Sequence, residues 1–174
     1  VIPPESVRVF DLAALDARNE ATIAVSVKAT VGRVVVGRSQ HYLGRGRLGY
    51  TMMLAASGMS DRWYFADGEK DDAVNEEFVI FNPLSNDQQL TFIITRDDGA
   101  PLDPLVVTAP AKRVTKFAPT TLGTLTPGRY SAVVTATSAT ASPSVGVVVE
   151  RVSTRQVEKS TATAVLLGAP SPSR

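Results

Sequence analysis

The sequence partly repeats itself, and this repetition constrains the fold more than any other feature. Residues 34–39 (VVVGRS) resemble residues 147–152 (VVVERV), and residues 51–56 (TMMLAA) resemble residues 164–169 (AVLLGA), both with an offset of 113 residues. Upstream, residues 3–10 resemble residues 110–117 with an offset of 107. Repeats of this kind indicate related structural units. We expect the first unit to correspond only to the later half of the second, as in a processed product or fragment.

Short apolar runs separated by turn residues predict an all-β fold. Residues 22–29 (TIAVSVKA) alternate with a period of two, as a half-buried strand does. The glycines of residues 44–47 (GRGR) predict a hairpin tip between strands at residues 34–42 and 48–55. Further strand-like runs lie at residues 78–81, 90–95, 105–108 and 129–137. This spacing is typical of a sandwich.

These patterns predict an antiparallel β-sandwich at residues 61–168, and the resemblance described below implies that it is Ig-like. A related, incomplete half-sandwich of about four strands is expected at residues 1–57, and a disordered tail at residues 169–174. Four strands with one apolar face are not easily stable alone. We therefore expect another protein chain, or an upstream segment, to complete residues 1–57.

Composition narrows the class of protein. Hydrophobic residues make up 44% of the chain and charged residues 20%, which indicates a globular protein. Cysteine is absent, so disulfides, thiolate metal sites and cysteine nucleophiles are excluded. No apolar run has the length of a membrane helix.

Charge is unevenly distributed along the chain. Residues 61–110 carry 11 Asp/Glu and 3 Lys/Arg, whereas residues 111–174 carry 2 and 8. Two interpretations remain open. The charges are solvated surface, or the acidic middle meets the basic flanks within the fold or between copies.

A cluster of carboxylates is a weak candidate for calcium. Asp67, Glu69, Asp71 and Asp72 offer the hard oxygen ligands that Ca²⁺ prefers. The spacing is not that of an EF-hand, because position 6 of such a loop would be Asp72 instead of glycine. A solvated acidic loop is the favoured interpretation, and we expect no cofactor.

A basic stretch with interspersed aromatic side chains is the candidate interaction patch. Such a patch suits polyanions, for example phosphate-bearing glycans or anionic lipid heads. Strand alternation, however, places some of these side chains on opposite faces. Nucleic acid is not expected, because no basic and aromatic RNA-binding motif is present. The patch comprises Arg33, Arg38, His41, Tyr42, Arg45 and Arg47.

The sequence offers few candidate catalytic residues. His41 is the only histidine, and no Gly-x-Ser-x-Gly motif surrounds it, so we expect no enzyme. Trp63 has two interpretations. It is a core side chain, which we favour, or a platform for stacking sugars.

Residues 62–68 (RWYFADG), followed by residues 78–83 (FVIFNP), resemble a β-sandwich family of unknown function. Its members occur in exported and cell-envelope proteins of actinobacteria. Residues 3–12 with residues 25–36 resemble the later half of the same module. The resemblance implies tandem Ig-like modules, an extracytoplasmic envelope location and a non-enzymatic role. The expected function is a structural or protein-interaction module with an envelope protein or polysaccharide as partner. The alternative is a carbohydrate-binding module that recognises an envelope polysaccharide.

Overall fold

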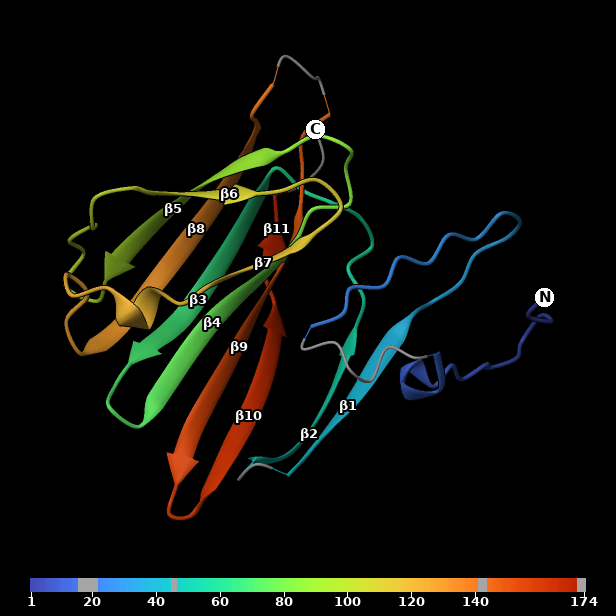
Figure 1. The fold of residues 1–174 in the computed structure, drawn as a ribbon, viewed down its shortest axis with the longest axis horizontal. Coiled ribbons are helices and arrows are strands. Elements are labelled where there is room, and N and C mark those ends of the chain that lie inside the picture. Colours follow the sequence, from blue (N-terminus) through green and yellow to red (C-terminus); the bar gives the residue numbers. More distant parts are fainter. Residues whose placement is uncertain (16–21, 45–46, 141–143, 172–174) are drawn as a thin grey trace.

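The computed structural model describes residues 1–15, 22–44, 47–140 and 144–171, and almost all of its regular structure is β (Figure 1). Two short 3₁₀ turns, η1 (Leu12–Leu15) and η3 (Pro119–Thr121), are the helical elements of these residues. No helix there is long and apolar enough to cross a membrane. The strands are β1 (Gly37–Gly44), β2 (Arg47–Leu54), β3 (Arg62–Lys70), β4 (Val74–Phe81), β5 (Gln88–Arg96), β6 (Leu105–Ala109), β7 (Val114–Phe117), β8 (Gly128–Ser138), β9 (Val148–Val157), β10 (Ser160–Leu167) and β11 (Ala169–Pro170).

Two packed sheets form a β-sandwich, which confirms the predicted fold class. A six-stranded sheet has the order β1-β2-β10-β9-β4-β7, and a five-stranded sheet has the order β11-β3-β8-β5-β6. Neighbouring strands are antiparallel except β2 and β10, which are parallel. Along β4 and β5 every second residue is buried, because successive side chains of a strand point to opposite faces.

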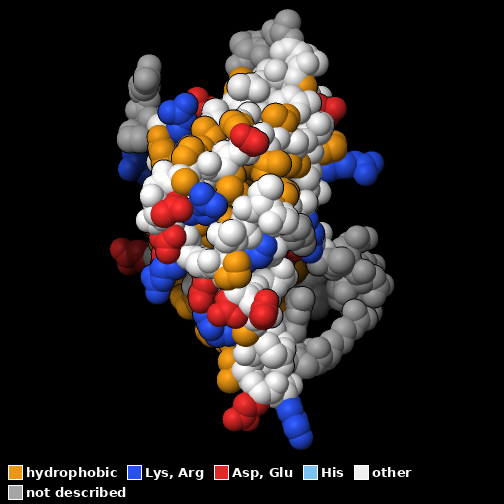
Figure 2. All heavy atoms as spheres, turned by 90° about the vertical axis from the view of Figure 1, so that its left-hand side faces the viewer, with side chains coloured by type: hydrophobic (Ala, Val, Ile, Leu, Met, Phe, Trp, Pro, Cys, Tyr) orange, Lys and Arg blue, Asp and Glu red, His pale blue; other side chains and the backbone are white. Residues whose placement is uncertain are grey.

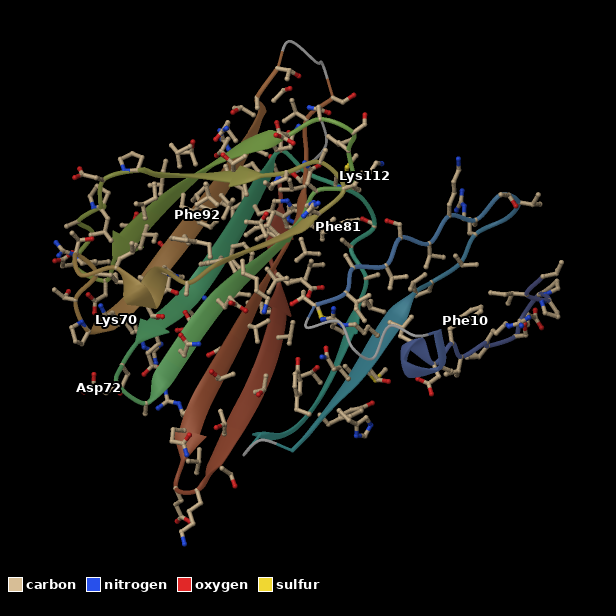
Figure 3. All side chains as sticks on the ribbon, in the orientation of Figure 1. Phe10, Lys70, Asp72, Phe81, Phe92 and Lys112 are labelled. Carbon is tan, nitrogen blue, oxygen red and sulfur yellow. The ribbon has the colours of Figure 1, made fainter. Side chains whose placement is uncertain are left out.

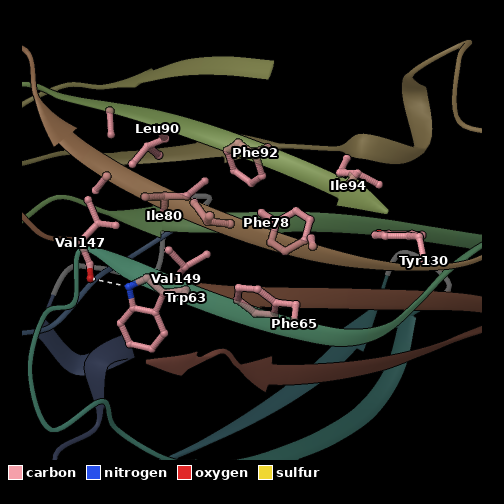
Figure 4. Packing of buried hydrophobic residues seen from close by; sticks show 14 of the residues in the cluster. Trp63, Phe65, Phe78, Ile80, Leu90, Phe92, Ile94, Tyr130, Val147 and Val149 are labelled. Atoms are coloured by element: carbon pink, nitrogen blue, oxygen red, sulfur yellow. Dashed lines mark hydrogen bonds between the residues drawn. The ribbon is translucent and has the colours of Figure 1, made fainter. Parts of the chain in front are cut away.

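Aromatic side chains from both sheets fill the core (Figure 4). The Phe78 ring lies at its centre, with centroids 5.0 Å from Phe65 and 5.4 Å from Phe92 in edge-to-face geometry. Trp63 is 1% exposed, and its indole N–H donates to the Val147 carbonyl at 2.9 Å. The predicted core position of Trp63 is therefore confirmed.

The repeat in the sequence is also a repeat in the structure. Shifting β1 and β2 by 113 residues places them on residues 150–157 of β9 and 160–167 of β10. Their pairing agrees as well, since Gly37 faces Leu54 in the first hairpin and Glu150 faces Leu167 in the second. The predicted strands around residues 44–47 are thus confirmed, and β1–β2 and β9–β10 are equivalent hairpins.

The two hairpins join edge to edge through their equivalent strands. Arg47 of β2 lies opposite Thr161 of β10, an offset of 114 residues. Gly49 agrees with this register, because a Cβ placed on it would lie 3.7 Å from the Thr163 backbone. Neighbours in a sheet point to the same face. Residues offset by 113 therefore point to opposite faces of the shared sheet.

Three expectations for the ends of the chain are corrected. Residues 22–29 form no strand, and the described residues before residue 57 form two of the about four expected strands. Alternation alone did not make residues 22–29 a strand, because no described strand lies beside them to pair with. The expected disordered tail begins too early, since Ala169 and Pro170 pair with Tyr64 and Trp63 as β11. Residues 172–174 lie outside the described part.

Candidate interaction surface

The β1–β2 hairpin extends the six-stranded sheet beyond β10, on the right of the view in Figure 1. Three apolar side chains of β2 point to one face of it, and Tyr50, Met52 and Leu54 are 54%, 74% and 64% exposed. We call them the hairpin face. The register places Met52 beside Leu166 of β10, which is 47% exposed. A contiguous, exposed apolar patch of this kind is typical of an interaction site.

The hairpin divides the predicted basic patch between two faces. His41 lies on the hairpin face, where its ring meets the Tyr50 ring edge-on at 4.7 Å. Arg38 and Tyr42 lie on the opposite face, because side chains alternate along β1. Arg33 is exposed and precedes β1. Arg45 and the side chain of Arg47 lie outside the described part of the structure. The patch is therefore not one surface.

Arg38 makes the principal polar contact between the two hairpins. Its guanidinium lies 3.0 Å from the Glu150 carboxylate of β9 and 3.1 Å from the Met53 sulfur. The register places Arg38, Met53, Leu167 and Glu150 in one row across β1, β2, β10 and β9. From the edge strand β1, the Arg38 side chain thus extends along one face of the sheet to Glu150 of β9.

The candidate calcium ligands do not converge. Asp67 pairs with Arg129 at 2.7 Å, and Glu69 pairs with Arg155 at 2.5 Å. Figure 3 shows Asp72 at the turn between β3 and β4, with Lys70 nearby. Within the described ranges, no group of three or more His, Cys, Asp or Glu side chains is placed to hold a metal. The acidic stretch is strand and turn instead of a ligand loop.

The acidic middle of the chain meets its basic C-terminal part inside the fold. Four ion pairs join them: Glu77 with Lys116, Asp67 with Arg129, Glu76 with Arg151, and Glu69 with Arg155. Of the two interpretations left open by the sequence, contact within the fold therefore holds for these four acids. Away from the hairpin, on the side of β5 and β6, charges of both signs are scattered among hydrophobic side chains (Figure 2).

A buried polar cluster lies under a bulge in β3, and sequence reasoning missed it. The β3–β8 register shifts between Phe65 and Gly68, which leaves the carbonyls of Ala66 and Asp67 turned inward. Arg151 donates to both carbonyls at 3.1 Å. Arg151 also lies 3.6 Å from the Glu76 carboxylate. The cluster satisfies backbone groups that the bulge would otherwise leave unpaired.

Tyr130 completes this cluster. Its hydroxyl donates to the Glu76 carboxylate, and the Glu69 N–H donates to the same carboxylate oxygen at 3.2 Å. Burial, and then the hydrogen bond to Glu76, raises the pKa of Tyr130 well above that of an ordinary tyrosine. Such a tyrosine stays protonated and cannot act as a base near neutral pH. We interpret the cluster as structural.

One hollow on the surface holds charged side chains. It is an open depression of about 260 Å³ beside the start of β8, lined among others by Asp67, Arg96 and Arg129. No histidine lines it, and two of its charged side chains, Asp67 and Arg129, pair with each other. His41 has Tyr50 as its ring neighbour in β1–β2.

One comparison with a solved structure supports the fold. A solved structure from Thermotoga maritima, "Crystal Structure of Thermotoga maritima 1070", has a TM-score of 0.56 at 16% identity, covering 67% of this chain and 97% of that one. The Anabaena sensory rhodopsin transducer has a TM-score of 0.44 at 22% identity, covering 55% of this chain and 83% of that one. No protein-family model and no curated protein matches the chain. The first likeness supports the β-sandwich architecture.

Proposed function

We propose that this protein is a non-catalytic interaction module of an exported cell-envelope protein, and that the β1–β2 hairpin is its binding element. One observation carries the proposal: Tyr50, Met52 and Leu54 are at least half exposed on a strand next to the sheet edge. Burying exposed apolar side chains stabilises a complex. A free strand edge adds main-chain hydrogen bonds to such a contact.

The envelope location and the Ig-like character of the sandwich are part of this proposal. They rest on the resemblance carried by residues 62–68 and 78–83. Residues 62–68 lie in β3 and residues 78–81 end β4, and their Trp63, Phe65 and Phe78 side chains belong to the core. The resemblance therefore concerns how the sandwich is built.

Binding is favoured over chemistry for a physical reason. A hydrolase needs a nucleophile or activated water, a base and a charge stabiliser in one cleft. The only histidine of the sequence lies on the exposed hairpin, and the buried carboxylate Glu76 is held by Arg151 and Tyr130. A rigid sandwich with an exposed edge and apolar face suits a binding role.

Site-specific photo-crosslinking tests this proposal. A benzophenone side chain replaces Met52 in one sample and Val106 of β6 in the control, because both native side chains are highly exposed, at 74% and 66%. Each sample is irradiated with a fraction of envelope proteins and polysaccharides. We expect a discrete protein adduct from position 52 and none from position 106. Identical products from both positions, or no adduct at 52, would contradict the proposal.

The alternative, a carbohydrate-binding module, is weakened by the position of Trp63. The candidate stacking ring is 1% exposed and lies inside the core. In the same experiment, an adduct of position 52 with polysaccharide in place of protein would favour the alternative.

A further inference from the structure

We propose that the free edge of β1 receives an antiparallel strand from a partner polypeptide, and that this strand brings a carboxylate to Arg38. The proposal rests on the proposed function, because it specifies how the hairpin binds its protein partner. In the second hairpin, β4 already occupies the edge of β9 that is equivalent to the free edge of β1.

The occupied edge belongs to β9. Strand β4 pairs with β9 antiparallel along its whole length, from Val74 opposite Arg155 to Phe81 opposite Val148. Strand β1 is the equivalent of β9, and it is the terminal strand of the six-stranded sheet. Among the described strands, β2 is the one that pairs with β1. No strand of the described residues therefore occupies the position equivalent to β4 in the first unit.

The arginines at the two equivalent positions differ in their surroundings. Arg151 has the Glu76 carboxylate and the carbonyls of Ala66 and Asp67 around its guanidinium, and its side chain is 8% exposed. Arg38 is its equivalent at an offset of 113, and its side chain is 35% exposed. Its one ion-pair partner in the described structure, Glu150, belongs to the second unit. An arginine fork can hold further acceptors.

The second hairpin also defines the register of the incoming strand. Phe78 lies opposite Arg151, and Glu76 lies opposite Ser153. Applying the offset of 113 places an aromatic or other apolar residue of the partner opposite Arg38. A glutamate two residues earlier then lies opposite Gln40. The partner is thus a strand that alternates apolar and polar residues and carries a glutamate on its apolar face, as β4 does.

Residues upstream of the hairpin support a partner of sandwich type. Ile23, Val25 and Val27 are 37%, 55% and 57% exposed. Their counterparts at the second offset of the repeat, 107 residues, belong to β8 and are 3% exposed or less. These counterparts are Tyr130, Ala132 and Val134. In the second unit, β8 is covered on its two edges by β3 and β5. The first unit therefore has apolar residues at the positions equivalent to β8, but without such neighbours in the described structure. Strands of the same kind would bury them.

A second copy of this chain does not supply the strand. Its β4 already pairs with β9 on one side and β7 on the other. Donating it would dismantle the core around Phe78, which is fully buried. The proposed partner is a different polypeptide whose strand has the chemistry of β4.

A synthetic strand tests the proposal directly. The probe is a fluorescent peptide with the sequence of residues 72–83, and its matched control carries Glu76→Gln. Both are titrated against the full chain, its Arg38→Gln variant and a control variant, Arg129→Gln, which removes an exposed arginine of another ion pair. We expect the probe to bind and to slow amide exchange in β1. We expect Arg38→Gln and peptide Glu76→Gln each to weaken binding roughly tenfold, as for a desolvated charge pair.

The double change should weaken binding no more than either single change, because both remove the same contact. Should the free peptide be too weak, the same strand is joined to the N-terminus of the full chain through a flexible linker, which raises its effective concentration. No protection of β1 in the joined form, or equal binding by Arg38→Gln, would overturn the proposal. Those results would leave the crosslink at position 52 intact, whereas failure of that crosslink would refute the proposed function itself.

Discussion

Arg38 and Arg151 stand at the same position of two equivalent hairpins, but only Arg151 is enclosed. The side chain of Arg151 is 8% exposed and that of Arg38 is 35% exposed. The difference arises from what lies around them. Strands β3 and β4 supply the carbonyls and the carboxylate that hold Arg151. The described part of the first unit has no such strands, so its arginine turns to Glu150 of the second unit.

Replacing Trp63 with alanine should strongly destabilise the fold. The side chain is almost fully buried, and truncating such a residue costs about 3–5 kcal/mol. The change also removes the donor to the Val147 carbonyl. Chemical denaturation measures the effect. Tyr64→Ala is the control, because the neighbouring Tyr64 is 42% exposed. A Trp63→Ala variant as stable as the control would contradict the core assignment.

Replacing Glu76 with glutamine should destabilise the protein far more than replacing Glu69. Glu76 is buried between Arg151 and Tyr130, and removing its charge leaves Arg151 uncompensated at a cost of about 3–5 kcal/mol. The side chains of Glu69 and Arg155 are 39% and 48% exposed, so Glu69→Gln should cost about 1 kcal/mol or less. Urea unfolding of both variants compares them. Equal losses would show that the cluster is not a structural centre.

Stability should fall at alkaline pH because of Tyr130. Its pKa is raised in the folded protein, first by burial and then by Glu76. A raised folded-state pKa gives a contribution that is complete below the unfolded-state pKa of about 10 and is lost as the pH rises above it. Unfolding free energies at about pH 8.5 and about pH 11 should differ less in Tyr130→Phe than in the unchanged protein. A Tyr130→Phe variant with the same difference would refute this assignment.

The bulge in β3 should tolerate no Cβ at Gly68. A methyl group there would lie 2.5 Å from the Tyr130 ring. The ring is tied to Glu76 and cannot move aside easily, so Gly68→Ala should cost about 1–3 kcal/mol. Nothing lies within 4 Å of a Cβ placed on Gly58, which makes Gly58→Ala the matched control. Thermal melts report both, and a Gly68→Ala variant that melts like the control would contradict the packing.

The sequence predicts the sandwich and the paired hairpins well, because both depend on local signals. The β-branched and aromatic runs at residues 78–81 and 90–95 lie within β4 and β5, and the Gly-rich tip places β1 and β2. The core position of Trp63 also follows from its aromatic neighbours. Residues 22–29 show the limit of this reasoning. They alternate as a strand does, yet a strand forms only where a neighbour offers hydrogen bonds.

The site was less accessible to sequence reasoning. The predicted patch included Arg38 and His41 because they are close in the sequence. Side chains alternate along β1, however, so these two residues, three positions apart, point to opposite faces of the sheet. Glu76, Tyr130 and Arg151 come from β4, β8 and β9, which lie far apart in the sequence. No local sequence pattern therefore indicates that they form a cluster. The repeat at an offset of 113 was the available signal, because it aligns Arg38 with Arg151, the arginine at the centre of the cluster.

Amide hydrogen exchange, read strand by strand in the free chain, tests the central claim most directly. The claim is that β1–β2 is the uncovered equivalent of β9–β10. Residues 37–44 should exchange much faster than residues 150–157, although the two segments have the same pairing register. The reason is that, among the described strands, only β9 has a neighbour on both sides. Equal protection of the two segments in the free chain would contradict the claim.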